Sequence, residues 1–357
     1  MSDQVTNALI AVVLGLVLAV VLLAPVAAVG YRRSGRFGPR DLLVLVAAAI
    51  YGLALWTYTL LPLPVEGDYA CVGRQLTPFD SIGAIDWGSA TSRHGLSALV
   101  HDPAFLQVAL NVLLFMPLGF FVRRVLRRGV IVATIAGLGI SLLIETTQTT
   151  GVWHLFSCAY RLFDVDDLLL NTVGATVGSL VAAIFVRRRR PEVVWPTSIT
   201  LGRRLLGMVC DLLFVVLLGS VLAIAHRAVQ LYVLDVPVDE LSTAPQQWLM
   251  WGVPALVEAA SVLLGGRTVG EGVVAVRAVT DRSVVPARVV KLLAGAGPLV
   301  ALLAIPTGWA SLALVGLAVV TVAAAVPTRE HRGLTHLLSG MDLEIARSDA
   351  RERRHGS

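Results

Sequence analysis

Nine long apolar runs constrain this chain more than any other feature of its sequence. Each run is long enough, as a helix, to cross a hydrocarbon core about 30 Å thick, for which about 20 residues suffice. The chain is 56% hydrophobic and only 15% charged, whereas soluble domains are about a quarter charged. We therefore predict an all-α, polytopic helical membrane protein with about nine transmembrane helices. The runs are 8–30, 41–62, 104–122, 130–150, 168–186, 205–225, 248–265, 288–305 and 309–326.

Clusters of arginine between these runs predict the orientation of the chain. They follow the first, third and fifth runs, at residues 32–40, 123–128 and 187–190. Short loops rich in Arg face the cytoplasm. The N-terminus is then outside, as are loops 63–103, 151–167 and 227–247, and the C-terminus is cytoplasmic. The net charge of +5 is accounted for by these loops, so we expect no nucleic-acid partner.

The Arg run at 187–190, with Pro191 and Pro196 behind it, divides the chain. We predict a membrane domain over 1–190 with five spans, a cytoplasmic linker over 191–200 and a second domain over 201–345 with four spans. Residues 346–357 are predicted to be a disordered tail. Alternating residues at 273–279, followed by a turn at 281–283, predict a short cytoplasmic β-hairpin near 268–285.

Polar residues in the first half gather on the predicted outer side. Glu145 and Gln148 share a helix face at i, i+3 spacing, and Asn111 lies within the third run. The stretch from Arg161 to Asn171 carries three carboxylates where a polar loop enters an apolar run; these are Asp164, Asp166 and Asp167. Acids at the mouth of a membrane helix are costly unless they are paired or functional.

Four motifs in the first half, taken in order, resemble the VanZ family over roughly residues 40–185. They are Leu76-Thr-Pro-Phe-Asp-Ser-Ile82, Asn111 through Pro117-Leu-Gly119, Glu145-Thr-Thr-Gln148, and Arg161 through Asn171-Thr-Val-Gly174. The resemblance implies a multi-pass protein of the bacterial cell membrane, associated with low-level resistance to the glycopeptide teicoplanin. The functional positions it implies are Pro78, Phe79, Asn111, Pro117, Glu145, Gln148, Arg161, Asp164, Asp167 and Asn171.

Three interpretations of this polar cluster stay open at this point. In the structural interpretation, Arg161 pairs with an Asp, and Asn171 forms a hydrogen bond with Glu145 or Asn111. Asp164 or Asp166 caps a helix. Gly174 and Gly178 are close helix contacts. In the second, the cluster binds a membrane lipid, a lipid-linked wall precursor or a glycopeptide antibiotic. In the third, Glu145, Asp164, Asp166 and Asp167 hold Mg²⁺ or Ca²⁺ and Glu145 acts as a base.

Among these we favour a non-enzymatic binding protein without a cofactor. Cys71 and Cys158 are both predicted outside, where a disulfide between them would be stable. The sequence alone does not bring the two cysteines together.

The second half resembles the RDD family over roughly residues 200–345. Arg204 and Asp211 share a helix face, and Gly266-Arg-Thr-Val-Gly270 and Arg277 follow the family's order. Glu271 stands where a basic residue is usual and His336 where the last Asp is usual. Some members of that family are linked to ion or proton exchange. We expect Arg204 and Asp211 to form a structural anchor; alternatively, Glu258 pairs with Arg204 or carries a proton in an ion-coupled transporter.

Overall fold

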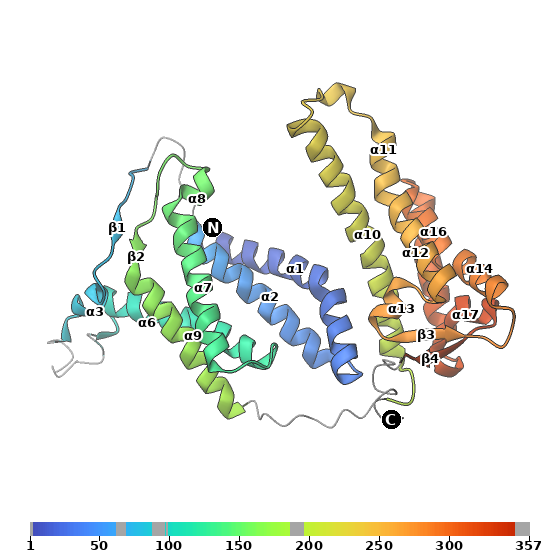
Figure 1. Ribbon diagram of the computed structural model, residues 1–357, viewed down its shortest axis with the longest axis horizontal. Coiled ribbons are helices and arrows are strands. Elements are labelled where there is room, and N and C mark those ends of the chain that lie inside the picture. The colour runs from blue at the N-terminus through green and yellow to red at the C-terminus, as the bar shows by residue number, and fades with distance from the viewer. Residues whose placement is uncertain (1–2, 62–68, 88–96, 98, 186–195, 347–357) are drawn as a thin grey trace, which may run out of the picture. The chain divides into compact units, whose positions relative to one another are not determined.

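The computed structural model describes residues 3–61, 69–87, 97, 99–185 and 196–346. In those ranges nine helical segments are long and apolar enough to span a membrane (Figure 1). Each coincides with one predicted apolar run, so the expected all-α polytopic architecture is confirmed. They are α1 (Asp3–Ser34), α2 (Pro39–Leu60), α6 (Pro103–Arg124), α7 (Val130–Thr149), α9 (Val165–Phe185), α10 (Leu201–Tyr232), Thr243–Gly265, Val284–Ala304 and α16 (Gly308–Ala325).

Two of these segments are composite. Thr243–Gly265 contains α11 (Thr243–Gln247), a π-helical turn at Trp248–Gly252 and α12 (Val253–Gly265). Val284–Ala304 contains α14 (Val284–Ala294) and α15 (Ala296–Ala304), with Gly295 between them. The shorter elements are β1 (Arg74–Gln75), α3 (Asp80–Gly83), α8 (Gly151–His154), β2 (Phe163–Asp164), α13 (Val269–Val273), β3 (Val276–Val279), α17 (Gly333–Ser339), β4 (Asp342–Ile345) and 3-10 turns at Val238–Glu240 and Arg329–His331.

The chain forms two compact units. The first joins Met1–Leu18 to Val46–Pro191, and the second joins Ala19–Leu45 to Glu192–Ser357. In the first unit α6, α7 and α9 lie side by side (Figure 1), and Leu55, Phe115 and Ile144 form a buried core between α2, α6 and α7. In the second unit α10 packs against α12 and α13, and α14 packs against α17.

Glycines bring α6 and α9 into backbone contact. A Cβ at Gly119 would lie 1.8 Å from the carbonyl oxygen of Ala175, and a Cβ at Gly178 would lie 1.9 Å from that of Met116. A Cβ at Gly174 would lie 2.3 Å from the Val112 oxygen. Only glycine permits this approach, so Gly174 and Gly178 are the close helix contacts expected of a GxxxG pattern.

The predicted β-hairpin near 268–285 is wrong in its pairing. The strand is present as β3, but it pairs antiparallel with β4, and Val276 lies opposite Ile345. Residues 269–273 form α13 instead, and the chain enters α14 at Val284. Alternation identifies a half-buried strand but does not identify its partner. The sheet therefore closes the second unit through its C-terminal segment.

Several predictions fall on residues that lie outside the described ranges. These are the Arg run at 187–190, residues 191–195 of the linker and residues 347–357 of the tail.

Candidate functional site

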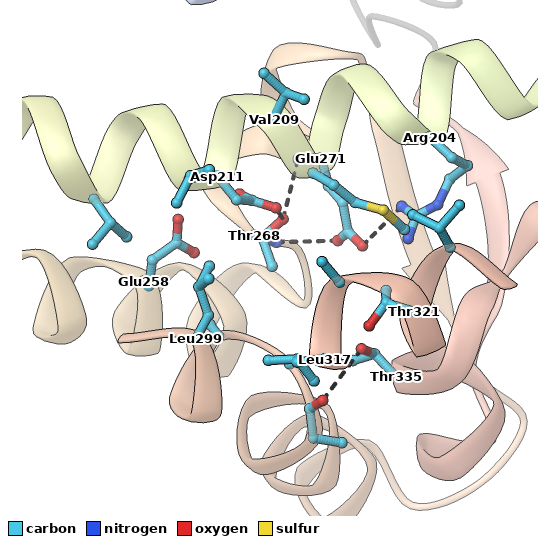
Figure 2. Close-up of a pocket in the computed structure, with 18 of the residues that line it drawn as sticks. Arg204, Val209, Asp211, Glu258, Thr268, Glu271, Leu299, Leu317, Thr321 and Thr335 are labelled. Carbon is cyan, nitrogen blue, oxygen red and sulfur yellow. Dashed lines mark hydrogen bonds and ion pairs between the residues drawn. The ribbon is translucent and has the colours of Figure 1, made fainter. Parts of the chain in front are cut away.

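The second unit contains a buried ionic cluster centred on Glu271, which α13 presents to the base of α10. The Glu271 carboxylate contacts Arg204 Nη1 at 3.2 Å (Figure 2). It also contacts Lys291 Nζ at 2.5 Å and His336 Nε2 at 2.9 Å. All four side chains are at most 5% exposed. Thr268 caps α13 in a reciprocal capping box with Glu271, which fixes the carboxylate toward the two cations.

Charge neighbours decide the protonation states in this cluster. Burial alone would raise the pKa of Glu271, but Lys291, together with His336 and Arg204, outweighs burial and holds this pKa well below its usual range. Burial also lowers the pKa of His336, because a buried imidazolium beside two cations is costly. Glu271 is therefore ionised at neutral pH and His336 is neutral.

The expected Arg204–Asp211 anchor is wrong. Asp211 accepts hydrogen bonds from Thr268 Oγ1 at 2.8 Å and from the backbone N–H of Gly270 at 2.5 Å, while Arg204 turns to Glu271. The alternative pairing of Glu258 with Arg204 is also absent from the ion pairs of the described residues. The i, i+7 spacing placed Arg204 and Asp211 on one face correctly, but α13 inserts between them and supplies a partner to each.

Of the other two predicted residues of this half, one lies in the ionic cluster and one lies outside it. His336 joins the cluster, whereas Arg277 lies on β3 and pairs with Glu344 of β4 at 3.2 Å, with both side chains more than half exposed. An exposed pair of this kind contributes about 0–1 kcal/mol. Sequence reasoning missed Lys291; its signal was that it is the only lysine in the chain and lies inside an apolar run.

In the first unit, α6, α7 and α9 bring the VanZ-like polar residues together. Asn111 Nδ2 donates to Asp167 Oδ1 between α6 and α9. Asn171 Nδ2 donates to Ser141 Oγ at 3.0 Å between α9 and α7. The expected bond from Asn171 to Glu145 or Asn111 is therefore wrong, because Ser141 lies one helical turn closer along α7. The Asn171 Oδ1 atom is buried and receives no hydrogen bond in the described part of the chain.

Asp164 and Asp166 serve backbone N–H groups. Asp164 precedes α9 and caps it by accepting from the N–H of Asp166 at 2.9 Å, as one interpretation of the sequence predicted. Asp166 accepts from the N–H groups of Phe79 and Ser81 at 2.6 and 2.8 Å and so holds the Pro78–Phe79 motif at the start of α3. Burial raises the pKa of Asp164.

Gln148 and Arg161 serve the end of α2. Gln148 Nε2 donates to the Thr59 oxygen at 2.6 Å, and Arg161 Nη2 donates to the Leu61 oxygen at 2.9 Å. Tyr160 OH donates to the Leu60 oxygen at 3.0 Å. These carbonyls have no partner within their own helix, so three side chains satisfy them. The predicted Arg161–Asp pair is wrong for this reason.

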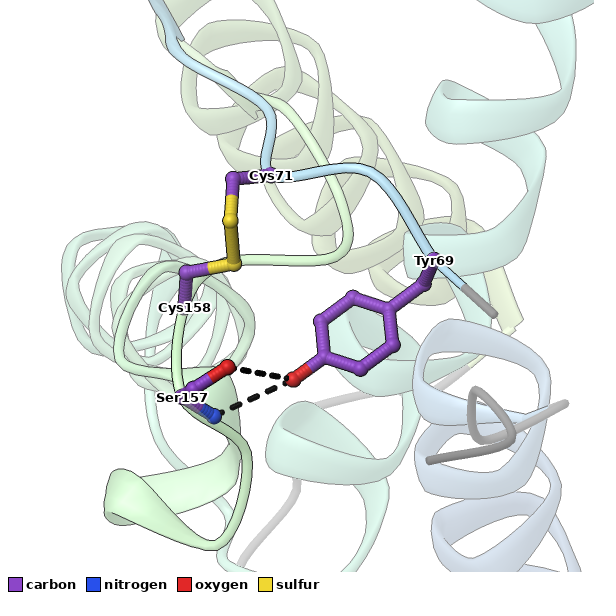
Figure 3. The surroundings of a disulfide bond; sticks show 4 residues. All are labelled: Tyr69, Cys71, Ser157 and Cys158. Atoms are coloured by element: carbon purple, nitrogen blue, oxygen red, sulfur yellow. Dashed lines mark hydrogen bonds between the residues drawn. A yellow bond between two sulfur atoms is a disulfide. The ribbon is translucent and has the colours of Figure 1, made fainter. Parts of the chain in front are cut away.

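A disulfide joins the two loops that carry these residues (Figure 3). Cys71 and Cys158 are bonded, with their Cα atoms 5.6 Å apart. Beside them Tyr69 OH lies 2.9 Å from Ser157 Oγ and accepts from the Ser157 N–H at 3.1 Å. The bridge leads into the parallel pairing of β1 with β2, which places Gln75 opposite Asp164.

Glu145 and its neighbours differ from the ionic cluster of the second unit. Glu145 is 2% exposed, and Glu145 Oε2 accepts one hydrogen bond, from the Asp164 N–H at 3.2 Å. Asp164 and Asp167 are the charges that act on it. No ion pair of the described residues involves these carboxylates or Asp166.

The metal-site prediction is not supported by this arrangement. Across the described ranges no three His, Cys, Asp or Glu side chains converge as ligands for a metal ion. Asp164 and Asp166 instead accept hydrogen bonds from backbone N–H groups.

Comparisons with known proteins bear on the first half alone. No curated protein and no solved structure matches the chain, and the RDD resemblance of residues 200–345 has no further support and stays a prediction. The VanZ/LLP1 family model matches from the middle of α2 to the end of α9, the region that contains Asn111, Glu145, Asp167 and Asn171. Over residues 48–186 this membrane protein is therefore similar to the VanZ/LLP1 family.

Proposed function

We propose that the VanZ-like half is a non-enzymatic binding protein of the bacterial cell envelope. Its ligand is a head group rich in hydrogen-bond donors, such as hydroxyl, amide or ammonium groups, presented at the outer leaflet. Two sources share this chemistry: lipid-linked wall precursors and glycopeptides of the teicoplanin type.

The proposal rests on hydrogen-bond acceptors of the polar cluster that backbone groups leave partly or wholly without a donor. Gln148, Arg161 and Asp166 are occupied by backbone groups. Glu145, with one backbone bond, and the orphaned Asn171 Oδ1 are acceptors without a cation. Buried acceptors of this kind are costly unless a partner satisfies them, and a donor-rich ligand would do so.

Two features support an outer location for this site. The Arg-rich loops before α2 and after α6 favour an outer location for the ends of α2 and α7 under the positive-inside rule. The Cys71–Cys158 disulfide belongs to the loops at that same end, and disulfides persist in oxidising compartments.

The test compares Glu145→Gln and Asp167→Asn with the wild type in a glycopeptide-susceptible host, with teicoplanin tolerance as the readout. Both variants remove a charge while keeping an acceptor oxygen, and we expect tolerance to be lost at unchanged membrane abundance. Glu240→Gln, on an exposed turn of the second unit, is the matched control. Unchanged tolerance in both variants would contradict the proposal.

Binding to the purified protein in lipid nanodiscs separates the two sources. One arm titrates teicoplanin alone and the other titrates a lipid-linked wall precursor alone. The arm that saturates in the wild type and weakens in Glu145→Gln identifies the ligand. Saturation in neither arm would overturn the head-group proposal even if tolerance changed.

A further inference from the structure

The ionic cluster of the second unit forms the floor of a cavity of about 480 Å³ between α10, α14, α15, α16 and α17. This volume lies within the range of small-ligand sites. Its walls are apolar and include Leu205, Met208, Leu212, Leu299, Leu314 and Leu317. The cavity therefore has apolar walls and one charged side, which the ionic cluster forms.

Two carboxyls in this cavity do not belong to the Glu271 cluster. Asp211 on α10 and Glu258 on α12 both line the cavity (Figure 2) and interact electrostatically with each other. Glu258 is 1% exposed. One of its oxygens accepts from the Val269 N–H at 3.3 Å, and the other, Oε1, receives no donor from the described residues.

The charge balance of the cavity calls for one further cation. Its titratable lining groups are Arg204, Asp211, Glu258, Glu271, Lys291 and His336. Arg204, Lys291 and His336 all contact Glu271, and no ion pair of the described residues includes Asp211 or Glu258. When Asp211 and Glu258 are both ionised, two carboxylates of the cavity therefore have no cation in contact with them. A buried charge without a counter-charge is unstable, so we expect a cation, either a proton or a ligand, between the two carboxyls.

Glu258 is also part of a second cavity. This cavity, of about 570 Å³, lies between α11, α12 and α15 and is lined by Trp248 and Trp251 as well as Glu258. Aromatic faces attract cations within about 6 Å by their ring quadrupoles. Glu258, whose Oε1 receives no donor from the described residues, therefore lines both a cavity with two tryptophans and a cavity with leucine walls.

We propose that the second unit binds a lipophilic monocation, with its charge between Asp211 and Glu258 and its apolar body against Leu299 and Leu317. In the absence of the ligand the two carboxyls share one proton. This proton is released when the cation binds, so the net charge of the cavity does not change. This site does not depend on the head-group proposal for the first half.

The test uses the full-length protein in nanodiscs of zwitterionic phosphatidylcholine, with radiolabelled tetraphenylphosphonium as the probe. Tetraphenylborate has nearly the same shape and the opposite charge, so it separates charge recognition from partition into lipid. We expect saturable binding of the phosphonium, no saturable binding of the borate, and release of up to one proton per site in weak buffer.

Glu258→Gln is the decisive variant, because glutamine keeps the acceptor to the Val269 N–H and removes the charge. The substitution removes one partner of a desolvated charge pair, so we expect affinity to fall by at least about thirtyfold, which corresponds to about 2 kcal/mol. Glu240→Gln should bind as the wild type does. If Glu258→Gln does not fold, Leu317→Trp, which fills the apolar chamber, decides instead by abolishing saturable binding.

Equal affinity of wild type and Glu258→Gln would overturn the proposal. Borate binding as tight as phosphonium binding, or the absence of saturable phosphonium binding to the wild type, would do the same.

Discussion

Replacing Glu271 by glutamine tests whether the buried ionic cluster holds the second unit together. The carboxylate is 3% exposed and is the anionic partner of Arg204 and Lys291 at 3.2 and 2.5 Å. Glutamine has nearly the same shape, so the substitution removes the charge without opening a cavity. Two buried cations are then left without a counter-charge.

The magnitude follows from the cost of breaking a buried pair from one side. Removing one partner of a buried ion pair destabilises proteins by about 3–5 kcal/mol. Since 1.4 kcal/mol is a factor of ten, the unfolding equilibrium constant should rise by about a hundred-fold to a few thousand-fold. We expect the loss to appear as a lower midpoint of unfolding by SDS in mixed micelles, with a matching loss of folded protein after mild heating.

A second substitution separates charge imbalance from lost packing. Lys291→Met on the Glu271→Gln background removes one of the stranded cations and should recover part of the lost stability. In the wild-type background the same Lys291→Met should destabilise. A loss below about 1 kcal/mol in Glu271→Gln, the value typical of exposed pairs, would refute the reasoning, as would the absence of any recovery in the double variant.

Three further predictions concern stability and use the same unfolding midpoint. Gly178→Ala should destabilise the protein by about 1–3 kcal/mol, because its Cβ would lie 1.9 Å from a carbonyl oxygen of α6. The control Gly139→Ala has open space around it and should be neutral or stabilising by up to about 1 kcal/mol. Equal effects of the two substitutions would contradict the close packing of α6 and α9. Cys71→Ser removes a disulfide between residues 87 positions apart and should lower the free energy of unfolding by about 2–5 kcal/mol. Reduction of the wild type should lower its unfolding midpoint to that of the variant, and a wild type insensitive to reductant would argue against the disulfide. Burial lowers the pKa of His336 below 6.5, so on acidification the unfolded chain binds a proton that the folded chain does not. Stability should therefore fall as the pH drops below about 6.5. His336→Gln should flatten this pH dependence, and an unchanged slope would show that another group causes it.

The spans were predictable because the membrane imposes them. A run of about 20 apolar residues has few alternatives to a helix in lipid, and all nine runs became helices in the described ranges. The gathering of Asn111 and Asp167 followed from the same pattern, because both lie toward the same end of neighbouring helices. Helical periodicity also assigned Arg204 and Asp211 correctly to one face.

The partners of polar side chains were not predictable in the same way. Gln148 and Arg161 looked like binding residues because they are polar at a membrane boundary, yet both satisfy carbonyls at the end of α2. Glu271 looked like a departure from a family pattern, yet it is the centre of the ionic cluster. In each case the partner is far away in the chain, and sequence spacing carries no information on it.

The two polar clusters balance their carboxylates by different means, and this affects how variants can be interpreted. Glu271 neutralises side-chain cations, so its loss leaves two buried cations without a counter-charge and should destabilise the second unit. Glu145 accepts only a backbone N–H, and a glutamine in its place retains an acceptor oxygen and strands no cation. Glu145→Gln should therefore fold normally. A loss of ligand binding in Glu145→Gln would then report on recognition and not on stability, which is the distinction that the function of the first half requires.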